Sequence, residues 1–336
     1  MPDIIELADE FRDALLKQER VAAVRMIEVY GRIWSRISQQ IAKLNRQIAD
    51  ARERGEVVNQ SWLFRQRRYG DLLHQVDERM RRFVTIAEKT ITREQAAAAK
   101  QAISDSIALM EAAADTADIP VSFNRLPVAA VENMAGFLGD GSPLRSLLDQ
   151  LPRSSRQIIE DGLIQAVALG ISPAATARKI REGLGGNLTR ALTISRTETL
   201  RAYRTATIQT YRANADVVQG WTWRSARSRR SCAACIALDG TFHAITEPMK
   251  THVRCRCTMI PSIRDVEVDK GPDWFERQSA KTQREILGTD IGFEAFKEGK
   301  LSLEDFVGLE RNAQWGDSYI QLSVKRALAG EAQFPE

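Results

Sequence analysis

Cysteine and histidine are scarce in this chain, which makes their placement informative. Among 336 residues there are four cysteines and three histidines. All four cysteines and two of the histidines, His243 and His252, lie between Cys232 and Cys257, and His252 lies just before the last cysteine pair. Disulfides would need an oxidising compartment, yet the first ten residues have neither the basic nor the apolar region of a secretory signal. We therefore expect reduced cysteines in an intracellular protein.

Long apolar runs are also missing. No uninterrupted apolar stretch approaches the roughly 18 residues that a membrane-spanning helix needs. The sequence therefore predicts a soluble protein that does not enter a membrane, and its length suffices for two or three domains with a sizeable core.

The chain has no large overall excess of positive or negative charge, but its charged residues are unevenly distributed. The net charge is +4, whereas Trp221 to Arg264 carries eight arginines or lysines against Asp239 and Glu247. This basic segment has two interpretations. In the first, Arg224, Arg227, Arg229 and Arg230 lie on an exposed strand or loop and contact nucleic-acid phosphates. In the second, the arginines offset thiolate charge nearby, which we favour for Arg254 and Arg256.

The cysteines have the spacing of a metal site. Cys232-Ala-Ala-Cys235 offers two thiolates from one tight turn, and a second short cluster follows 16 residues later. That cluster is His252-Val-Arg-Cys255-Arg-Cys257. Five candidate ligands compete for the four places around a tetrahedral zinc: either the four cysteines bind, or His252 replaces Cys255 or Cys257. A zinc with four such ligands has no open position for water, so we expect a structural ion.

The N-terminal third has helical periodicity. Apolar residues recur at steps of three and four in two seams, separated by a break from Gly55 to Ser61, and this predicts an antiparallel helical hairpin. The first seam could alternatively be a docking face for another protein. His74, beside the second seam, is expected at the surface or its boundary. The seams comprise Ile27, Tyr30, Trp34, Ile37, Ile41, Leu44 and Ile48, and then Tyr69, Leu73, Val76, Met80 and Phe83.

Further helices are expected along the middle of the chain. One runs from about Thr92 to Ala117, and irregular connections follow at Pro120 to Pro127 and Gly136 to Pro143. The helical pattern resumes at Pro152, stops at Gly170 and starts again at Pro173. The glycines from Gly183 to Asn187 predict a loop between helices; without a lysine at the required position, they do not form a phosphate-binding loop. Ser195 and Glu198 fit a capping box that begins the next helix.

Past Gly220 the pattern changes to short strands. Trp221 and Trp223 alternate as on one strand face, and Asp239-Gly240 favours a tight hairpin after the first cysteine pair. So small a module buries too little to fold alone, and metal binding would supply the missing free energy. Short amphipathic helices are expected for the remainder, over 274–288, 293–303 and 309–329.

These motifs occur in an order that resembles a known family. Arg196-Thr197-Glu198 opens the series, a tryptophan strand and Cys232-x-x-Cys235 follow, and Leu238-Asp239-Gly240, Phe242 and His252-x-x-Cys255-Arg-Cys257 precede Pro261. From about Gln157 to Pro261 the chain resembles the phage Mu F-like head morphogenesis domain. Glu247 to Thr251 departs from the family's usual proline-rich approach to the histidine, which bears on that loop more than on the metal.

The resemblance implies a minor head protein of a tailed bacteriophage. It implies a virion protein that acts in head assembly at or near the portal or in the capsid interior, after residence in the host cytoplasm. The implied partners are portal, capsid or scaffolding proteins, with contact to packaged DNA possible and no membrane. No catalysis is implied, and the residues after Cys257 resemble the short helical tail common in this family.

Two rivals come from other classes. A zinc-braced nuclease of the His-metal type needs a histidine base and a second His or Asn, for which only His243 and His252 are near. A DNA-binding zinc module needs Arg224 to Arg230 to face outward together. The expected fold is mainly α with a small zinc-bound β-module. Its segments are a helical hairpin or bundle (1–119), a connection (120–156), the helical part of the Mu F-like domain (157–215), the β-module (216–265) and a helical tail (266–336).

Overall fold

The computed structural model describes residues 3–127, 130, 144–263, 269–313 and 315–335. It is mainly helical with small sheets, as predicted. The chain forms two compact units, each assembled from separated stretches. Unit 1 comprises Met1–Gln18, Gln95–Gly141 and Thr197–Glu336, and unit 2 comprises Glu19–Glu94 and Ser142–Arg196. The contiguous segments proposed above stay predictions about domains, and the connection predicted at Gly136 to Pro143 lies outside the described residues.

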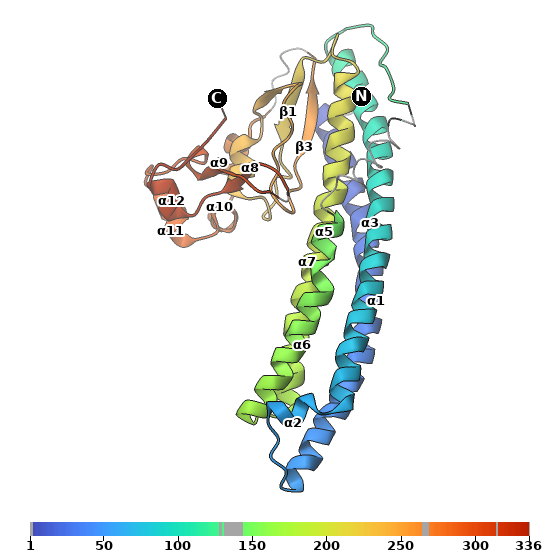
Figure 1. Ribbon diagram of the computed structural model, residues 1–336. Helices are drawn as coiled ribbons and strands as arrows, with labels where there is room; N and C mark the ends of the chain where they lie inside the picture. Colours follow the sequence, from blue (N-terminus) through green and yellow to red (C-terminus); the bar gives the residue numbers. More distant parts are fainter. Residues whose placement is uncertain (1–2, 128–129, 131–143, 264–268, 314, 336) are drawn as a thin grey trace. The chain divides into compact units, whose positions relative to one another are not determined.

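Unit 2 is a bundle of long helices that lie side by side (Figure 1). Its hydrogen bonds link different helices: the Tyr30 hydroxyl donates to the carbonyl of Leu184 at 2.7 Å, and Arg156 pairs with Asp77 at 2.8 Å. The bundle contains parts of α1 (Ile4–Glu53), α3 (Arg67–Thr116) and α7 (Pro173–Arg212), together with α2 (Gln60–Phe64), α5 (Leu144–Leu148) and α6 (Gln150–Leu169).

The two predicted seams form the core of this bundle, with one exception. All five residues of the second seam are buried, and the Tyr30 ring packs edge-on against Phe83 at 5.1 Å. In the first seam Ile27 is 44% exposed, whereas most of the residues that follow are buried. The predicted break is also present, since α1 ends at Glu53 and Gly55 takes a positive φ of 78°. His74 is exposed, as expected.

Two helix boundaries predicted from the sequence are wrong. The expected loop from Gly183 to Asn187 is helical, because α7 runs unbroken from Pro173 to Arg212. Gly183 serves close packing instead, since a Cβ there would lie 2.7 Å from Ile158 of α6, whereas a Cβ on Gly185 or Gly186 would meet open space. Ser195 and Glu198 are consequently mid-helix and fully buried, so they form no capping box.

The helix expected to start near Thr92 is not separate. It is the second half of α3, since no proline or glycine between 84 and 116 interrupts the helix. The predictions of an α7 start at Pro173, a stop at Gly170 with φ of 64°, and an irregular stretch before Pro127 are confirmed.

Unit 1 holds a three-stranded antiparallel sheet in the order β2-β1-β3. The strands are β1 (Gly220–Arg224), β2 (Phe242–Ala244) and β3 (Thr258–Ser262). Trp221 and Trp223 of β1 are both buried, as their alternation predicts, with ring centroids 6.1 Å apart. The predicted hairpin at Asp239-Gly240 is wrong, because the residues before it form a helix, α8 (Ala233–Leu238), and not a strand. The three alanines of α8 favour a helix. The strand after the turn, β2, pairs with β1 instead.

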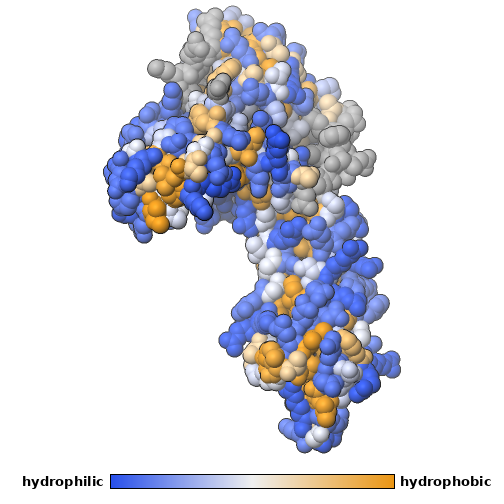
Figure 2. Space-filling model, turned by 60° about the vertical axis from the view of Figure 1, so that its left-hand side comes forward, coloured by the Kyte–Doolittle hydropathy of each residue, from blue (hydrophilic) through white to orange (hydrophobic). Residues whose placement is uncertain are grey.

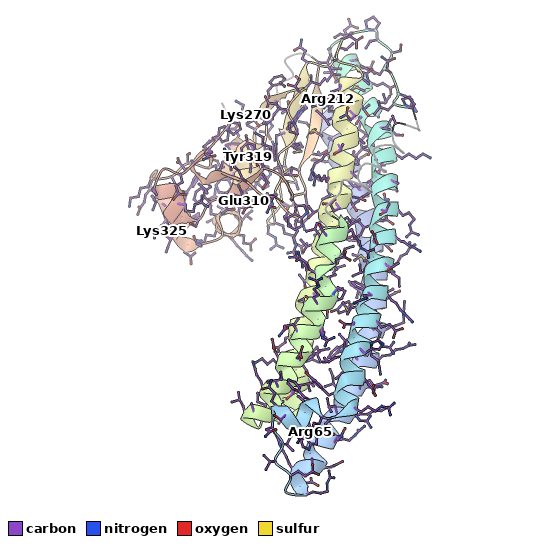
Figure 3. The ribbon with its side chains drawn as sticks, in the orientation of Figure 1. Arg65, Arg212, Lys270, Glu310, Tyr319 and Lys325 are labelled. Atoms are coloured by element: carbon purple, nitrogen blue, oxygen red, sulfur yellow. The ribbon has the colours of Figure 1, made fainter. Side chains whose placement is uncertain are left out.

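Helical segments of unit 1 support this sheet. Leu15, Ala102 and Tyr203 belong to one apolar cluster formed by α1, α3 and α7. Two arginines of α7, two helical turns apart, then fasten the loops of the sheet to the helix. Arg204 donates to the carbonyls of Cys255 and Cys257, and Arg212, labelled in Figure 3, donates to those of Ile245 and Thr246.

The C-terminal tail is only partly helical. The expected helices over 274–288 and 293–303 are present in shorter form, but a single helix over 309–329 is wrong, because two paired strands occupy parts of this stretch and only 324–328 of its described residues are helical. A Cβ on Gly308 would lie 2.3 Å from the Leu322 side chain, a closeness that suits neighbouring strands. The elements are α9 (Gly271–Glu276), α10 (Ala280–Leu287), α11 (Asp290–Lys297), a 3₁₀ turn η1 (Glu304–Phe306), β4 (Val307–Glu310), β5 (Ser318–Gln321) and α12 (Val324–Leu328).

The surface carries several exposed apolar side chains. On the face drawn in Figure 2, apolar residues form separate patches among polar ones. In unit 2, Val21, Val24 and Ile27 of α1 are each exposed to between 44% and 52%. Within the described ranges, no helix is both long and apolar enough to cross a membrane.

Candidate metal centre

The first half of the centre is built on the start of α8. Cys232 is the N-cap residue of this helix, and its Sγ accepts a hydrogen bond from the Cys235 amide at 3.4 Å. Cys235 follows in the first turn and is buried. A cysteine pair at this spacing therefore places both sulfurs at one end of a short helix, as the knuckle interpretation predicts.

The second half is the loop before β3. The amide of Cys255 donates to the carbonyl of His252 at 3.1 Å, and Arg254 between them takes a positive φ of 65°. This tight turn, with the extended residues after it, brings Cys255 and Cys257 to the same place; both are buried, and the Cys257 amide lies 3.5 Å from the Cys255 sulfur.

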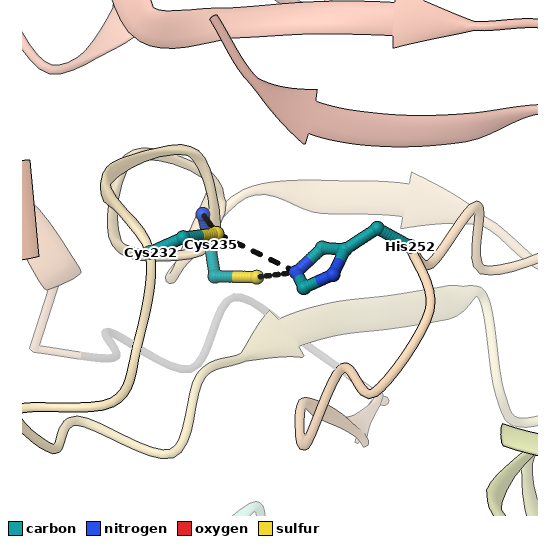
Figure 4. A group of neighbouring side chains, drawn as sticks. All are labelled: Cys232, Cys235 and His252. Atoms are coloured by element: carbon teal, nitrogen blue, oxygen red, sulfur yellow. Dashed lines mark hydrogen bonds between the residues drawn. The ribbon is translucent and has the colours of Figure 1, made fainter. Parts of the chain in front are cut away.

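The two halves meet. Figure 4 shows Cys232 and Cys235 facing His252, whose Nε2 lies 3.4 Å and 3.2 Å from their sulfurs. The Cys235 and Cys255 sulfurs are 3.8 Å apart, and none of the four cysteines is in a disulfide. Ligand atoms within 4.8 Å of one another form two groups that could hold a metal ion: Cys232, Cys235 and His252, and Cys235, Cys255 and Cys257. Cys235 belongs to both groups.

The imidazole of His252 has a defined orientation. Its Nδ1 lies 2.8 Å from the carbonyl of Val253, which accepts a hydrogen bond from that nitrogen and leaves Nε2 directed at the sulfurs. This is the usual arrangement of a metal-binding histidine, in which the second nitrogen donates to a backbone carbonyl.

Proton affinity within the cluster is strongly perturbed. The hydrogen bond with Cys235 lowers the pKa of Cys232 to about 5, against the opposing effect of burial. Burial lowers the pKa of His252, but the charge on Cys255 and the bond to Cys232 outweigh it and raise the pKa to about 11. The lowered pKa values of Cys232 and Cys255 favour negative charge on these two sulfurs, whereas neighbouring sulfurs and burial raise the pKa values of Cys235 and Cys257. A bound metal ion would stabilise the thiolate form of its cysteine ligands.

Positive side chains surround the sulfurs. Arg230, Arg254 and Arg256 line a cavity of about 20 Å³ beside the cluster, which is roughly the room that one water molecule or small ion needs. This position agrees with the interpretation that Arg254 and Arg256 offset thiolate charge. Sequence reasoning missed Arg204, whose guanidinium fixes the carbonyls of Cys255 and Cys257; its spacing of eight residues from Arg212 on one helix face was the available signal.

Half of the proposed phosphate-binding arginines are not free to bind DNA. Arg224 is 4% exposed and pairs with Asp9 at 2.8 Å. Arg227 pairs with Asp239 at 2.6 Å and with Asp269 at 2.7 Å. Arg229 and Arg230 are exposed. The expectation that all four face outward together is therefore wrong, because acidic groups from other segments pair with Arg224 and Arg227; exposed Arg229 also lies 3.7 Å from Glu285.

His243 is part of the apolar core, not of the metal cluster. It is 5% exposed, its ring stacks on Trp221 with centroids 4.3 Å apart, and its nitrogens lie 2.9 Å from the Thr241 hydroxyl and 3.3 Å from Glu247. Burial lowers the pKa of His243, although the bond to Glu247 opposes this shift. The ring is thus neutral at pH 7 and has a packing role.

This lowered pKa predicts an acid-sensitive fold. In the unfolded chain the histidine takes up its proton near pH 6.5, whereas the folded protein resists protonation until a lower pH. The stability contributed by His243 is therefore complete above about pH 6.5 and is lost as the pH falls toward the folded-state pKa. The free energy of unfolding, measured with denaturant between pH 7.5 and 5.5, should fall less steeply with decreasing pH in His243→Phe than in wild type. Equal slopes would contradict the assignment, since the cysteine cluster titrates in both proteins.

Comparison with known proteins gives one match. Residues 157–260 match the family model described as Phage Mu protein F like protein, and this confirms the resemblance on the same stretch. No curated protein and no solved structure matches the chain. The matched segment ends within β3 and includes all five candidate ligands, so the Cys/His cluster is a feature of the family-like part of the chain.

Proposed function

We propose that this chain, whose residues 157–260 form a phage Mu protein F like segment, is a bacteriophage minor head protein. It acts in head morphogenesis through protein contacts, at or near the portal and inside the head, with portal, capsid or scaffolding proteins as partners. The observation that carries the proposal is the family match over 157–260. The structure supports an assembly role through the architecture of that segment, in which Arg204 and Arg212 of α7 fasten the loops of the three-stranded sheet to a long helix.

The metal in this proposal is a structural zinc. With Zn–S distances of about 2.3 Å and Zn–N distances of about 2.0 Å, two ligands of a tetrahedral zinc lie about 3.8 Å apart when both are sulfur and about 3.5 Å apart when one is nitrogen. The observed separations are 3.8 Å between sulfurs, and 3.4 Å and 3.2 Å from sulfur to Nε2. These separations of Cys232, Cys235, His252 and Cys255 fit zinc, which would tie α8 to the loop before β3; Cys257, within 4.8 Å of Cys235 and Cys255, is the fifth candidate for the four places.

Catalysis forms no part of the proposal. The rival nuclease would need His243 as a base, but its ring is buried against Trp221 with both nitrogens engaged. Contact with packaged DNA, where it occurs, would fall to exposed residues such as Arg229 and Arg230.

The test uses a phage that encodes this chain. Deleting its gene should abolish normal heads, and a plasmid copy should restore them. The chain should also be detectable by mass spectrometry in purified heads, and the purified protein should leave DNA uncut with divalent metals. Normal heads without the chain, or cutting that His243→Ala abolishes, would contradict the proposal.

Point variants serve the complementation better than a truncation of 1–119. Residues 4–18 and 95–116 contribute to the core of unit 1, so that truncation would unfold the protein. Val24→Glu with Ile27→Glu instead adds charge to the exposed end of the first seam, and we expect fewer heads from a correctly folded protein. Ile291→Glu on α11, an apolar side chain 72% exposed, is the matched control and should complement fully.

A further inference from the structure

A cavity of about 380 Å³ lies in unit 1, apart from the metal cluster. One wall is a face of α7, where Arg201, Thr205 and Ile208 recur at helical spacing. The loop that includes Met249 and Lys250 and the segment that includes Trp315 complete it. Small-molecule sites typically start at about 300 Å³ and combine apolar walls with a few polar groups, as here.

Two hydrogen-bond donors at this cavity have no acceptor. Nη1 of Arg201 and Nε1 of Trp315 are both enclosed, and neither has a partner among the described residues. A buried donor without an acceptor is destabilising, and such groups in native proteins call for an explanation such as a ligand. Both donors line the same cavity, so one ligand with several acceptor atoms would satisfy them together.

The charge of the cavity is positive. Arg201 and Lys250 are partly buried, and neither forms an ion pair within the described residues. Lys250 instead lies over the Tyr319 ring, 5.7 Å from its centroid; Tyr319 is labelled in Figure 3. The acid that lines the cavity, Asp317, is exposed, so water screens its charge. An anion would therefore meet two cations of which neither is already neutralised.

We propose that this cavity binds a phosphate monoester, either a free nucleotide or the phosphorylated end of a nucleic-acid strand. A phosphate monoester carries a charge of about −1.5 to −2 and three terminal oxygens, which match two cations and several N–H and O–H donors; a carboxylate has one charge and two oxygens. The apolar walls at Ile208, Met249 and Trp315 would face the remainder of the molecule. This inference depends on neither the metal nor the proposed head function.

The test is calorimetric titration of the full-length protein at constant ionic strength. The probes are inorganic phosphate, acetate, deoxyadenosine monophosphate, and a short oligonucleotide with and without a 5′-phosphate. Phosphate and the phosphorylated probes should bind wild type, and Arg201→Gln should weaken them by about tenfold or more, because a charge-assisted hydrogen bond is lost. Tighter binding of the mononucleotide would identify a free nucleotide as the source, and tighter binding of the phosphorylated oligonucleotide a strand end.

Control variants separate a built site from general charge. Arg311→Gln removes the same charge from an exposed arginine of the tail that does not line the cavity, and it should leave binding unchanged. Lys250→Gln gives a second test of the cavity if Arg201→Gln fails to fold by circular dichroism. Equal losses in the cavity variants and in Arg311→Gln, acetate binding as tight as phosphate, or no phosphate binding to wild type would each overturn the proposal.

Discussion

Cys235→Ser is expected to abolish metal binding and to unfold the sheet of unit 1. Cys235 belongs to both groups of ligand atoms, so its removal leaves only two ligand atoms in each group, whereas the loss of any other cysteine leaves one group of three intact. Structural zinc contributes on the order of 10 kcal/mol to the folding of small modules. Metal analysis should give about one zinc per wild-type chain and almost none in the variant. Hydrogen exchange at β1 and β3 should become fast in the variant, while the helices of unit 2 stay protected.

Cys257→Ser is the matched comparison for that experiment. Cys257 lies in only one of the two groups, and Cys232, Cys235, His252 and Cys255 would still supply four donors. This variant should therefore retain zinc, with weaker affinity, and keep its sheet. Wild-type protein that folds fully without bound metal would refute the zinc proposal, and equal zinc loss in both variants would assign Cys257 to the ligand set.

The sequence was most informative where chemistry or periodicity left few alternatives. The five metal-ligand candidates lie close together because they belong to two short sequence clusters. Each cluster gathers its own ligands in a tight turn, so the fold has to bring only these two turns together. The seam that contains Tyr69 and Phe83 is buried throughout because its spacing matches the helical repeat. These predictions depend on local geometry, which the residue order largely determines.

Glycine shows what local reasoning could not resolve. Gly55 and Gly170 end helices with a positive φ, as predicted. Gly183 has no such strain and lies inside α7, where it makes room for Ile158 of another helix. The same residue type thus ends a helix or allows two helices to approach, and only the partner helix distinguishes the two. The misplaced capping box at Ser195 and Glu198 followed from this error.

Long-range partners also decided the electrostatics. Arg224 and Arg227 have the composition of a nucleic-acid contact, but Asp9 and Asp269 are distant in sequence and neutralise them. In the tail, β4 pairs with β5 where the pattern predicted a helix, and Gly308 leaves room for the Leu322 side chain. A pattern of charge or hydrophobicity limits a segment to a few structures or contacts. Which of these forms depends on the segment that packs against it.

Arg204→Ala is expected to lower the free energy of unfolding by about 3–5 kcal/mol. The guanidinium is 8% exposed and donates to the carbonyls of Cys255 and Cys257 at 2.8 to 3.1 Å, and to the Thr251 hydroxyl at 3.1 Å. Removal leaves two buried carbonyls without these donors and opens a cavity between α7 and the cysteine loop. Urea unfolding of the zinc-loaded protein, monitored by fluorescence of the buried tryptophans in β1, measures this loss.

Arg212→Ala on the same helix tests whether the stability lost in Arg204→Ala comes from the hydrogen bonds themselves or from their burial. Arg212 also donates to two carbonyls, at 3.0 Å and 2.8 Å, but it is exposed, so water can replace its bonds. Its loss should cost below about 1 kcal/mol. Similar losses in the two variants would show that the bonds to α7 matter regardless of burial. The expected difference would instead mean that α7 stabilises the metal loop mainly by satisfying carbonyls that water cannot reach.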